Sequence, residues 1–256
     1  MWGWIDRKGV EEAKKAATKA IALDDKLAEG HWAFGTAKMN DLDWEGAEAE
    51  YQKGLNLEPG NSDGLRFMGV LATALGRLDE ATRLNKQSLA LDPIKPITYL
   101  QIGINMYYSN RLDEAIVSFK KTLELNPQFP RTHTFMGKVY LLQGKPEIAL
   151  AEMQQETDQT WKDYGMSLAY QALGRQKEAD EALRNYIARF QNSKLYNVAE
   201  IYAFRREKDK AFEWLEKAYK GREVRLTYLK GDPLLKNLEG DPRHRAFLKK
   251  MNLPVD

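Results

Sequence analysis

Three residue types recur along this chain at a fixed interval of 34 residues, and this repetition constrains the fold more than any other feature. The recurring glycines are Gly35, Gly69, Gly103 and Gly137, the alanines are Ala47, Ala81, Ala115 and Ala149, and the prolines are Pro59, Pro93 and Pro127. Such a period indicates stacked helix-turn-helix units, each of which buries its apolar face against the next. We expect each glycine to face a small residue, so that the two helices of a unit can approach closely.

The composition excludes several classes of protein. The formal net charge is +2, so no overall field favours nucleic acid, and cysteine is absent, so disulfides and thiolate metal sites are excluded. No apolar run reaches the ~18 residues of a membrane span, and the N-terminus lacks the basic start and apolar core of a signal peptide. We therefore expect a cytoplasmic protein, with a truncated N-terminus. Basic residues exceed acidic ones in 205–250, which indicates a solvated face or a patch for an acidic partner.

The 34-residue interval predicts where each unit of the chain begins and ends. The expected units are 1–27 (the second helix of a partial repeat), 28–61, 62–95, 96–129, a shortened 130–159, the repeat-like 160–191 and 192–225, and a C-terminal cap at 226–256. The turn at Leu173–Arg175 comes only 30 residues after the turn at Gln143–Lys145. About one helical turn is therefore missing near Gln155–Gln159, and we expect a changed rotation between the fourth and fifth repeats.

Both ends of the chain depart from the repeat. A lone second helix at residues 10–23 leaves apolar surface that repeat arrays normally cover. Either Trp2 and Trp4 fold back over it, or another chain covers it. At the other end, the Asp-Pro pairs at Asp232 and Asp241 predict short helices with an aspartate cap and proline in the first turn, and we expect them to cover the last repeat.

The units resemble the tetratricopeptide repeat. Its pattern of Trp-x2-Leu-Gly-x2-Tyr, then Ala, Phe and Pro, is best matched at Gly103, Ala115, Phe119 and Pro127, and the likeness covers residues 10–220. Ser167 and Ala199 replace the glycine, and Asn85 and Met153 replace the aromatic residue. The resemblance implies an all-α, right-handed superhelical solenoid of helix-turn-helix repeats with a C-terminal helical cap.

The end of the chain is similar to the C-terminal tails of certain bacterial signalling proteins. The similarity rests on Ala211–Tyr219, Tyr228–Lys230 and the two Asp-Pro segments. In those proteins a tetratricopeptide array follows a class III adenylate cyclase, a winged-helix DNA-binding domain or a protein kinase domain. The resemblance implies that this chain is the sensor or interaction portion of such a protein, without its effector domain.

Residue patterns that carry chemistry are not found in this sequence. His31 and His133 occupy the same repeat position and are expected to pack between helices, while His244 is expected to be solvated. No glycine-rich phosphate loop occurs, and acidic pairs such as Asp79-Glu80 stand where second helices begin, where they stabilise the helix N-terminus. We expect no catalytic residue, no metal ion and no cofactor.

The resemblance implies a binding groove lined by the first helix of each repeat. The candidate partner-binding residues are Trp32, Thr36, Met39, Arg66, Tyr107, Tyr108, Arg131, Lys138, Trp161, Tyr164, Gln171, Tyr196 and Glu200. Aromatic and arginine side chains are common in binding hot spots, and this surface suits a peptide. The alternative is that these side chains pack between adjacent first helices. A charge reversal at Arg131 plus Lys138 is expected to weaken partner binding and leave the thermal midpoint nearly unchanged.

The main functional hypothesis is a non-catalytic scaffold or regulatory domain of a bacterial signalling protein, which binds a peptide or partner domain in its groove. Two alternatives remain. The chain is a self-association module that forms homo-oligomers through its N-terminal helix, or it is the C-terminal portion of a multidomain enzyme, such as an adenylate cyclase, with the catalytic domain upstream. Nucleic-acid binding is not expected, because the basic tail lacks interleaved aromatic platforms.

Overall fold

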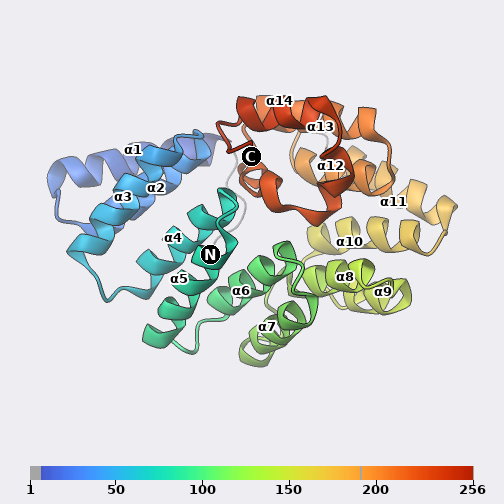
Figure 1. Cartoon of the computed structure of the whole chain (residues 1–256), viewed down its shortest axis with the longest axis horizontal. Helices are drawn as coiled ribbons and strands as arrows, with labels where there is room; N and C mark the ends of the chain where they lie inside the picture. The colour runs from blue at the N-terminus through green and yellow to red at the C-terminus, as the bar shows by residue number, and fades with distance from the viewer. Residues whose placement is uncertain (1–6, 191, 256) are drawn as a thin grey trace. The chain divides into compact units, whose positions relative to one another are not determined.

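The computed structural model describes residues 7–190 and 192–255, in which every regular element is a helix (Figure 1). Helix α1 (Arg7–Leu23) precedes six hairpins. Their first helices are α2 (Ala28–Asn40), α4 (Ser62–Ala74), α6 (Pro96–Tyr108), α8 (Thr132–Leu142), α10 (Gln159–Ala172) and α12 (Leu195–Phe204). Their second helices are α3 (Trp44–Leu57), α5 (Leu78–Leu91), α7 (Leu112–Leu125), α9 (Pro146–Gln154), α11 (Gln176–Arg189) and α13 (Lys208–Lys220). The 3-10 helices η1 (Val224–Gly231) and η2 (Pro233–Leu238) and helix α14 (Pro242–Lys250) follow.

The helices form two compact units. The first unit holds the described residues up to Pro93, Ala218–Gly231 and those from Glu239 onward, and the second holds Ile94–Lys217 and Asp232–Leu238. Within the first unit α2 contacts α4, and within the second unit α6, α8, α10 and α12 contact one another in order. Each unit therefore has a layer of first helices backed by second helices. The predicted all-α fold of helix-turn-helix repeats is confirmed.

The repeating glycine makes room for a large side chain of the second helix. A Cβ on Gly35 would lie 2.6 Å from the ring of Tyr51, and a Cβ on Gly137 would lie 2.6 Å from Met153. Both distances are shorter than real carbon contacts, so neither position admits even alanine without movement of the partner. The expectation of a small facing residue was wrong in this respect. The glycine faces the large residue four positions after the alanine, while the backbone carbonyl of Ala47 also comes close to Gly35.

The hairpin turns follow one pattern. Two positions after each described first helix ends, the backbone is left-handed, with φ of +77°, +70° and +69° at Gly76, Gly144 and Gly174, and 62°, 56° and 63° at Leu42, Asn110 and Arg206. A side chain makes this conformation costly by about 1 kcal/mol, so the turns without glycine are strained. A side-chain cap starts α3, whereas α5, α7, α9 and α11 begin without a side-chain cap hydrogen bond. Asp43 accepts a hydrogen bond from the Gly46 amide at 3.0 Å at the start of α3.

The fourth hairpin is short because its second helix is short. Helix α9 has 9 residues, whereas α7 and α11 each have 14. The segment after α9 is held by the side chain of Glu156, which is 3% exposed. Its carboxylate accepts hydrogen bonds from the amides of Arg131 at 3.1 Å, Thr134 at 3.2 Å and Asp158 at 3.2 Å. Glu156 therefore links the start of α8 to the turn before α10, a role that the sequence pattern did not reveal.

Helix α1 packs against α2 with one face. Ala17 is buried, and Ile21 lies next to Gly30 of α2. The opposite face of α1 carries Leu23, whose side chain is 78% exposed. Trp2 and Trp4, one of the two alternatives for covering this helix, lie outside the described residues.

Candidate partner-binding surface

Most of the predicted groove residues are buried. Ten of the thirteen are buried, namely Trp32, Met39, Arg66, Tyr107, Tyr108, Lys138, Trp161, Tyr164, Tyr196 and Glu200. Thr36, Arg131 and Gln171 are partly exposed. Packing between neighbouring first helices accounts for several of the buried side chains. Trp32, for example, lies between Gly54 of α3 and Gly64 of α4. Their role in partner binding stays a prediction.

Aromatic side chains join the first helices of the second unit. The ring of Phe135 on α8 lies 6.1 Å from Tyr107 on α6 and 6.1 Å from Trp161 on α10. Trp161 also meets Tyr164 edge-on at 5.8 Å. Contacts of this kind contribute about 0.5–1.5 kcal/mol each beyond their buried area. They make this layer a rigid base on which other chain segments can be held.

Lys138 of α8 lies at the centre of this layer with no exposed side-chain surface. Its Nζ donates a hydrogen bond to Glu200 of α12 at 2.9 Å, and Asp232 lies 3.9 Å away. The rings of Tyr107 and Phe135 lie 5.2 Å and 5.1 Å from the ammonium, within cation–π range. The expectation that reversing this charge would leave the thermal midpoint unchanged does not fit a buried lysine, because the change would place a third carboxylate beside Glu200 and Asp232 in a dry site.

The segment Asp232–Leu238 docks on the first helices of the second unit. The Tyr196 hydroxyl of α12 donates to Asp232 Oδ2 at 3.1 Å, and Asn237 donates to the Ala203 carbonyl. Three leucines of the segment, Leu234, Leu235 and Leu238, are buried. Asp232 accepts from the Leu234 amide and begins η2, and Asp241 begins α14 in the same way, so the predicted Asp-Pro helix starts are confirmed.

Within the first unit, η1 docks on first helices as well. It contacts α4 most extensively and α2 to a smaller extent. Leu226 and Leu229 of η1 are 2% and 1% exposed, and the Lys230 side chain lies beside Gly76. The C-terminal segment was expected to cover the last repeat. Helix η2 does so, but η1 lies against the first two full repeats, because its leucines find their apolar partners there.

The end of the chain packs on the α2–α3 turn of the first unit. The Trp44 indole donates to the Met251 carbonyl at 2.9 Å, beside an open pocket of 710 Å³. Acidic residues line this pocket, but they have basic neighbours: Asp43 is paired with Lys38 at 2.9 Å, and Glu48 with Arg77 at 2.8 Å. The pocket therefore shows no constellation for acid–base chemistry.

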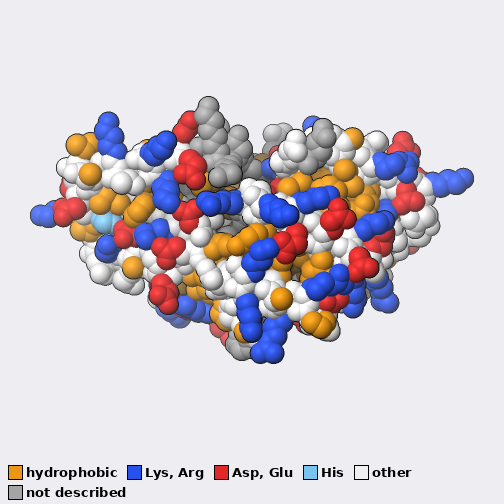
Figure 2. All heavy atoms as spheres, turned by 90° about the horizontal axis from the view of Figure 1, so that it is seen from above, with side chains coloured by type: hydrophobic (Ala, Val, Ile, Leu, Met, Phe, Trp, Pro, Cys, Tyr) orange, Lys and Arg blue, Asp and Glu red, His pale blue; other side chains and the backbone are white. Residues whose placement is uncertain are grey.

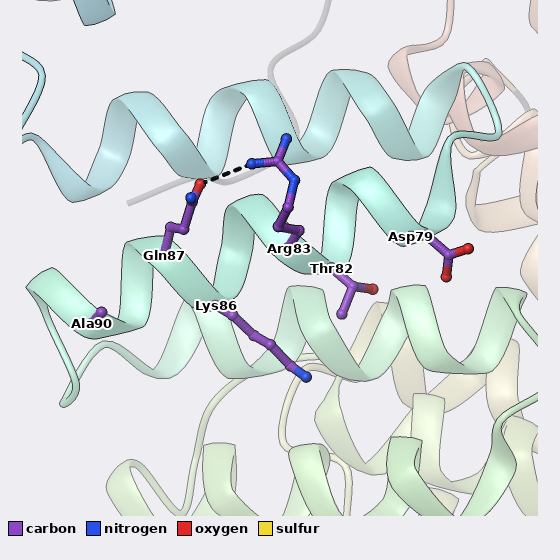
Figure 3. Close-up of a pocket in the computed structure, with 6 residues that line it drawn as sticks. All are labelled: Asp79, Thr82, Arg83, Lys86, Gln87 and Ala90. Carbon is purple, nitrogen blue, oxygen red and sulfur yellow. Dashed lines mark hydrogen bonds between the residues drawn. The ribbon is translucent and has the colours of Figure 1, made fainter.

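A second open pocket, of 470 Å³, lies along one face of α5. Figure 3 shows its six lining residues, which project from this one helix: Asp79, Thr82, Arg83, Lys86, Gln87 and Ala90. The drawn hydrogen bond runs from Arg83 to Gln87 at 3.3 Å. Apart from the buried Thr82 these are exposed side chains, and their spacing is that of one helix face. The pocket has no nucleophile with a neighbouring base.

The histidines form structural pairs. His31 Nδ1 lies 2.7 Å from Glu50 Oε2, and His133 Nδ1 lies 2.9 Å from Glu152 Oε2, at equivalent repeat positions. Burial raises the pKa of Glu50, but hydrogen bonds from His31 and Lys53 outweigh it and hold that pKa below its ordinary value. The histidines thus have carboxylate partners that the sequence pattern did not reveal. The described residues contain no cluster of three or more His, Cys, Asp or Glu placed to hold a metal ion.

His244 is buried rather than solvated, which corrects the expectation from the sequence. It lies on α14 beside the buried Phe247 and Leu248. Burial lowers the pKa of His244 below its ordinary value, because the charged imidazolium is poorly solvated there.

Several basic residues near the C-terminus have acidic partners in the same stretch, so they are paired locally although the stretch keeps its basic surplus. Lys210 pairs with Glu207 at 2.6 Å, and Arg243 pairs with Asp241 at 2.7 Å. Figure 2 shows basic and acidic side chains interspersed on the face that it draws. Among the described helices, none has the length and apolar character that crossing a membrane requires.

Comparisons with known proteins agree with this geometry. A family model described as TPR repeat matches residues 105–144, and no curated protein matches by sequence. The structure is similar to PilW, a widely conserved type IV pilus biogenesis factor, at 20% identity and a TM-score of 0.62, over 75% of this chain and 90% of that one. It is also similar to a thermophilic tetratricopeptide-repeat protein of Thermus thermophilus, at 16% identity and a TM-score of 0.58, over 75% and 99%.

A third similar structure comes from the APC/C hetero-tetramer Cut9-Hcn1. It is 14% identical with a TM-score of 0.66, over 94% of this chain and 46% of that one. Identities this low show a shared fold and no shared activity. The chain has the tetratricopeptide-repeat fold, and the region that the family model matches, 105–144, contains α7 and α8 with Lys138 and ends at Gly144.

Proposed function

We propose that this chain is a non-catalytic protein–protein interaction scaffold that holds a peptide or partner domain on its first helices. The observation that carries the proposal is where the non-repeat segments dock. In the first unit η1 contacts α4 and α2, and in the second unit η2 contacts α12. These are all first helices. Short segments outside the repeats therefore already use this surface as their binding partner within one chain.

The chemistry of this surface suits a peptide. It offers apolar positions for leucines and a buried donor, Tyr196, for a carboxylate. Recognition by pockets for a few anchoring side chains is typical of short-peptide binding. Among the predicted groove residues, Thr36, Arg131 and Gln171 retain exposed surface and are the leading candidates for contact with a partner. The Arg131 guanidinium lies 5.9 Å from the Trp161 ring, which holds it in one orientation.

The biological setting that we propose is bacterial signalling, in the cytoplasm. Support comes from the similarity of Ala211–Tyr219 and the two Asp-Pro segments to tails of such proteins. In that setting the chain is a regulatory portion, and a catalytic domain such as an adenylate cyclase lies upstream. Self-association through α1 is the second candidate, and the observation that favours it is Leu23, which is 78% exposed on α1. Light scattering over a range of concentrations separates the two.

Site-specific photo-crosslinking tests the proposal. A photoreactive amino acid is placed at Thr36 or Gln171 on first helices or at Arg131 directly before α8, and at Glu45, Glu147 or Lys177 on second helices of the same repeats. The full chain is then irradiated in cells of its source. We expect partner adducts from the first-helix positions and few from their matched controls. Adducts that form only from the second-helix positions would refute the proposed surface.

A further inference from the structure

The segment Asp232–Leu238 binds the second unit in the manner of a peptide ligand. It lies outside the repeats and reaches their first helices through a few side chains. The carboxylate of Asp232 accepts from Tyr196 and lies near Lys138, and the amide of Asn237 reaches the backbone of α12. Leu234 and Leu235 lie between these polar anchors and Leu238 follows them, and all three leucines are buried. The order Asp, Pro, Leu, Leu, Lys, Asn, Leu therefore indicates the kind of peptide sequence that the site recognises.

The surface on which Asp232–Leu238 docks keeps its main ion pair when this segment leaves. Lys138 donates to Glu200 at 2.9 Å, whereas Asp232 lies farther away, at 3.9 Å. Departure of Asp232 thus removes the weaker of these two carboxylate contacts, and the ammonium keeps a charged partner on α12. The large cost of stranding a buried charge is avoided. The rings around Lys138 belong to α6, α8 and α10, so they stay in place as well.

We propose that Asp232–Leu238 is an exchangeable resident ligand, and that this site takes partner segments which present an aspartate, a proline and two leucines in the same order. The inference rests on the proposed function and specifies its ligand. The resident segment competes at high effective concentration, because it is part of the same chain. A partner therefore binds with an apparent affinity reduced by the small fraction of molecules whose segment is undocked.

Peptide binding to the full chain tests this inference. The probe is a fluorescent peptide with the sequence of residues 230–239, and the control peptide carries Asp232→Asn. The chain is used as wild type, with Asp232→Asn to weaken the resident segment, and with Asp79→Asn as an exposed acidic control. We expect saturable binding of the native peptide to the wild-type chain. Asp232→Asn in the chain should tighten this binding about tenfold, because the resident segment loses one charge-assisted contact and competes less well. Asp79→Asn should leave the binding unchanged. The control peptide is expected to bind at least about tenfold more weakly.

Hydrogen exchange of the wild-type chain provides a readout that needs no variant. We expect the amides of Leu234, Leu235 and Leu238 to exchange through a local opening, faster than the core amides of α8 and α12. Exchange of the segment only through global unfolding, or absence of peptide binding to both the wild-type and Asp232→Asn chains, would overturn the inference. Either result leaves the crosslinking outcome free to support or refute the first-helix surface itself.

Discussion

Lys138 and Glu200 form an ion pair of 2.9 Å across 62 residues of sequence, and neither side chain has exposed surface. The pair joins α8 to α12, which are first helices two repeats apart. A buried pair of this kind costs desolvation energy that its attraction only partly repays, so it is weak evidence for stability. The pair instead favours the packing of α8 against α12, because burying either charge without the other would be costly.

Removing one partner of this pair is expected to be costly. Lys138→Met keeps most of the length of the side chain but leaves Glu200 buried without its ammonium, which should lower the free energy of unfolding by about 3–5 kcal/mol. The double variant Lys138→Met/Glu200→Gln removes both charges and should recover at least half of that loss. Urea unfolding followed by circular dichroism measures both values. A loss below about 1 kcal/mol for Lys138→Met would show that the pair is not buried as described.

Glu156 is expected to hold the junction between the fourth and fifth repeats. Glu156→Gln replaces one of the two accepting oxygens by an amide group. If Oε1 is replaced, the backbone amides of Arg131, Thr157 and Asp158 lose their acceptor, and if Oε2 is replaced, the amide of Thr134 loses its acceptor. Hydrogen bonds to a charged group contribute about 1.5–3 kcal/mol, and we expect a loss of that size in unfolding free energy. Glu147→Gln on the exposed face of α9 is the matched control and should stay within about 0.5 kcal/mol of wild type. Equal effects of the two variants would contradict the role of Glu156.

The left-handed turn at Arg206 offers a stabilising substitution. Arg206 is exposed and has φ of 63°, the conformation that Gly76, Gly144 and Gly174 adopt at the equivalent position. Arg206→Gly relieves the side-chain strain, and after the added freedom of the unfolded chain we expect a gain of about 0.5 kcal/mol. Arg206→Ala removes the same charge but keeps Cβ, and it should give no gain. If alanine stabilises as much as glycine, charge rather than backbone strain explains the effect.

The stability of the chain is expected to fall in mild acid because of His244. Burial lowers the pKa of this imidazole in the folded protein, while the unfolded chain titrates near pH 6.5. Between the lowered pKa and about pH 6.5 the unfolded state binds more protons, so the free energy of unfolding rises with pH in that window and the contribution is flat above it. Nearby Glu239 and Asp241 oppose the shift but do not cancel it. The variant His244→Leu should lose less stability than wild type between pH 7.5 and 5.5. An identical loss in both proteins would assign the pH dependence elsewhere.

The fold was predictable from sequence because the same close contact between the two helices recurs in several repeats. Gly35 must make room for Tyr51, and Gly103 for Phe119, so the same residue types return at the same interval. The Asp43 cap is local in the same sense, since its hydrogen bond reaches only three residues along the chain. Contacts that recur in every repeat produce a periodic residue pattern, which can be recognised in a single sequence.

The candidate site was less predictable because its contacts are not local. Asp232 meets Tyr196 from 36 residues away, and the Trp44 indole meets the Met251 carbonyl across 207 residues. No interval relates such residues, and leucines in a non-repeat tail do not reveal which surface they cover. The groove residues were placed by repeat position alone, and burial of side chains such as Tyr164 depends on neighbours that repeat position does not identify.

The most direct test of the first-helix surface is hydrogen exchange of the purified chain with and without the partner that crosslinking identifies. We predict slowed exchange in first helices, such as α2, α8 and α10, and little change in α3, α9 and α11 of the same repeats. Local protection of this kind reports which backbone segments the partner stabilises. Protection confined to the second helices, or to α1 alone, would contradict the central claim that the first helices carry the partner.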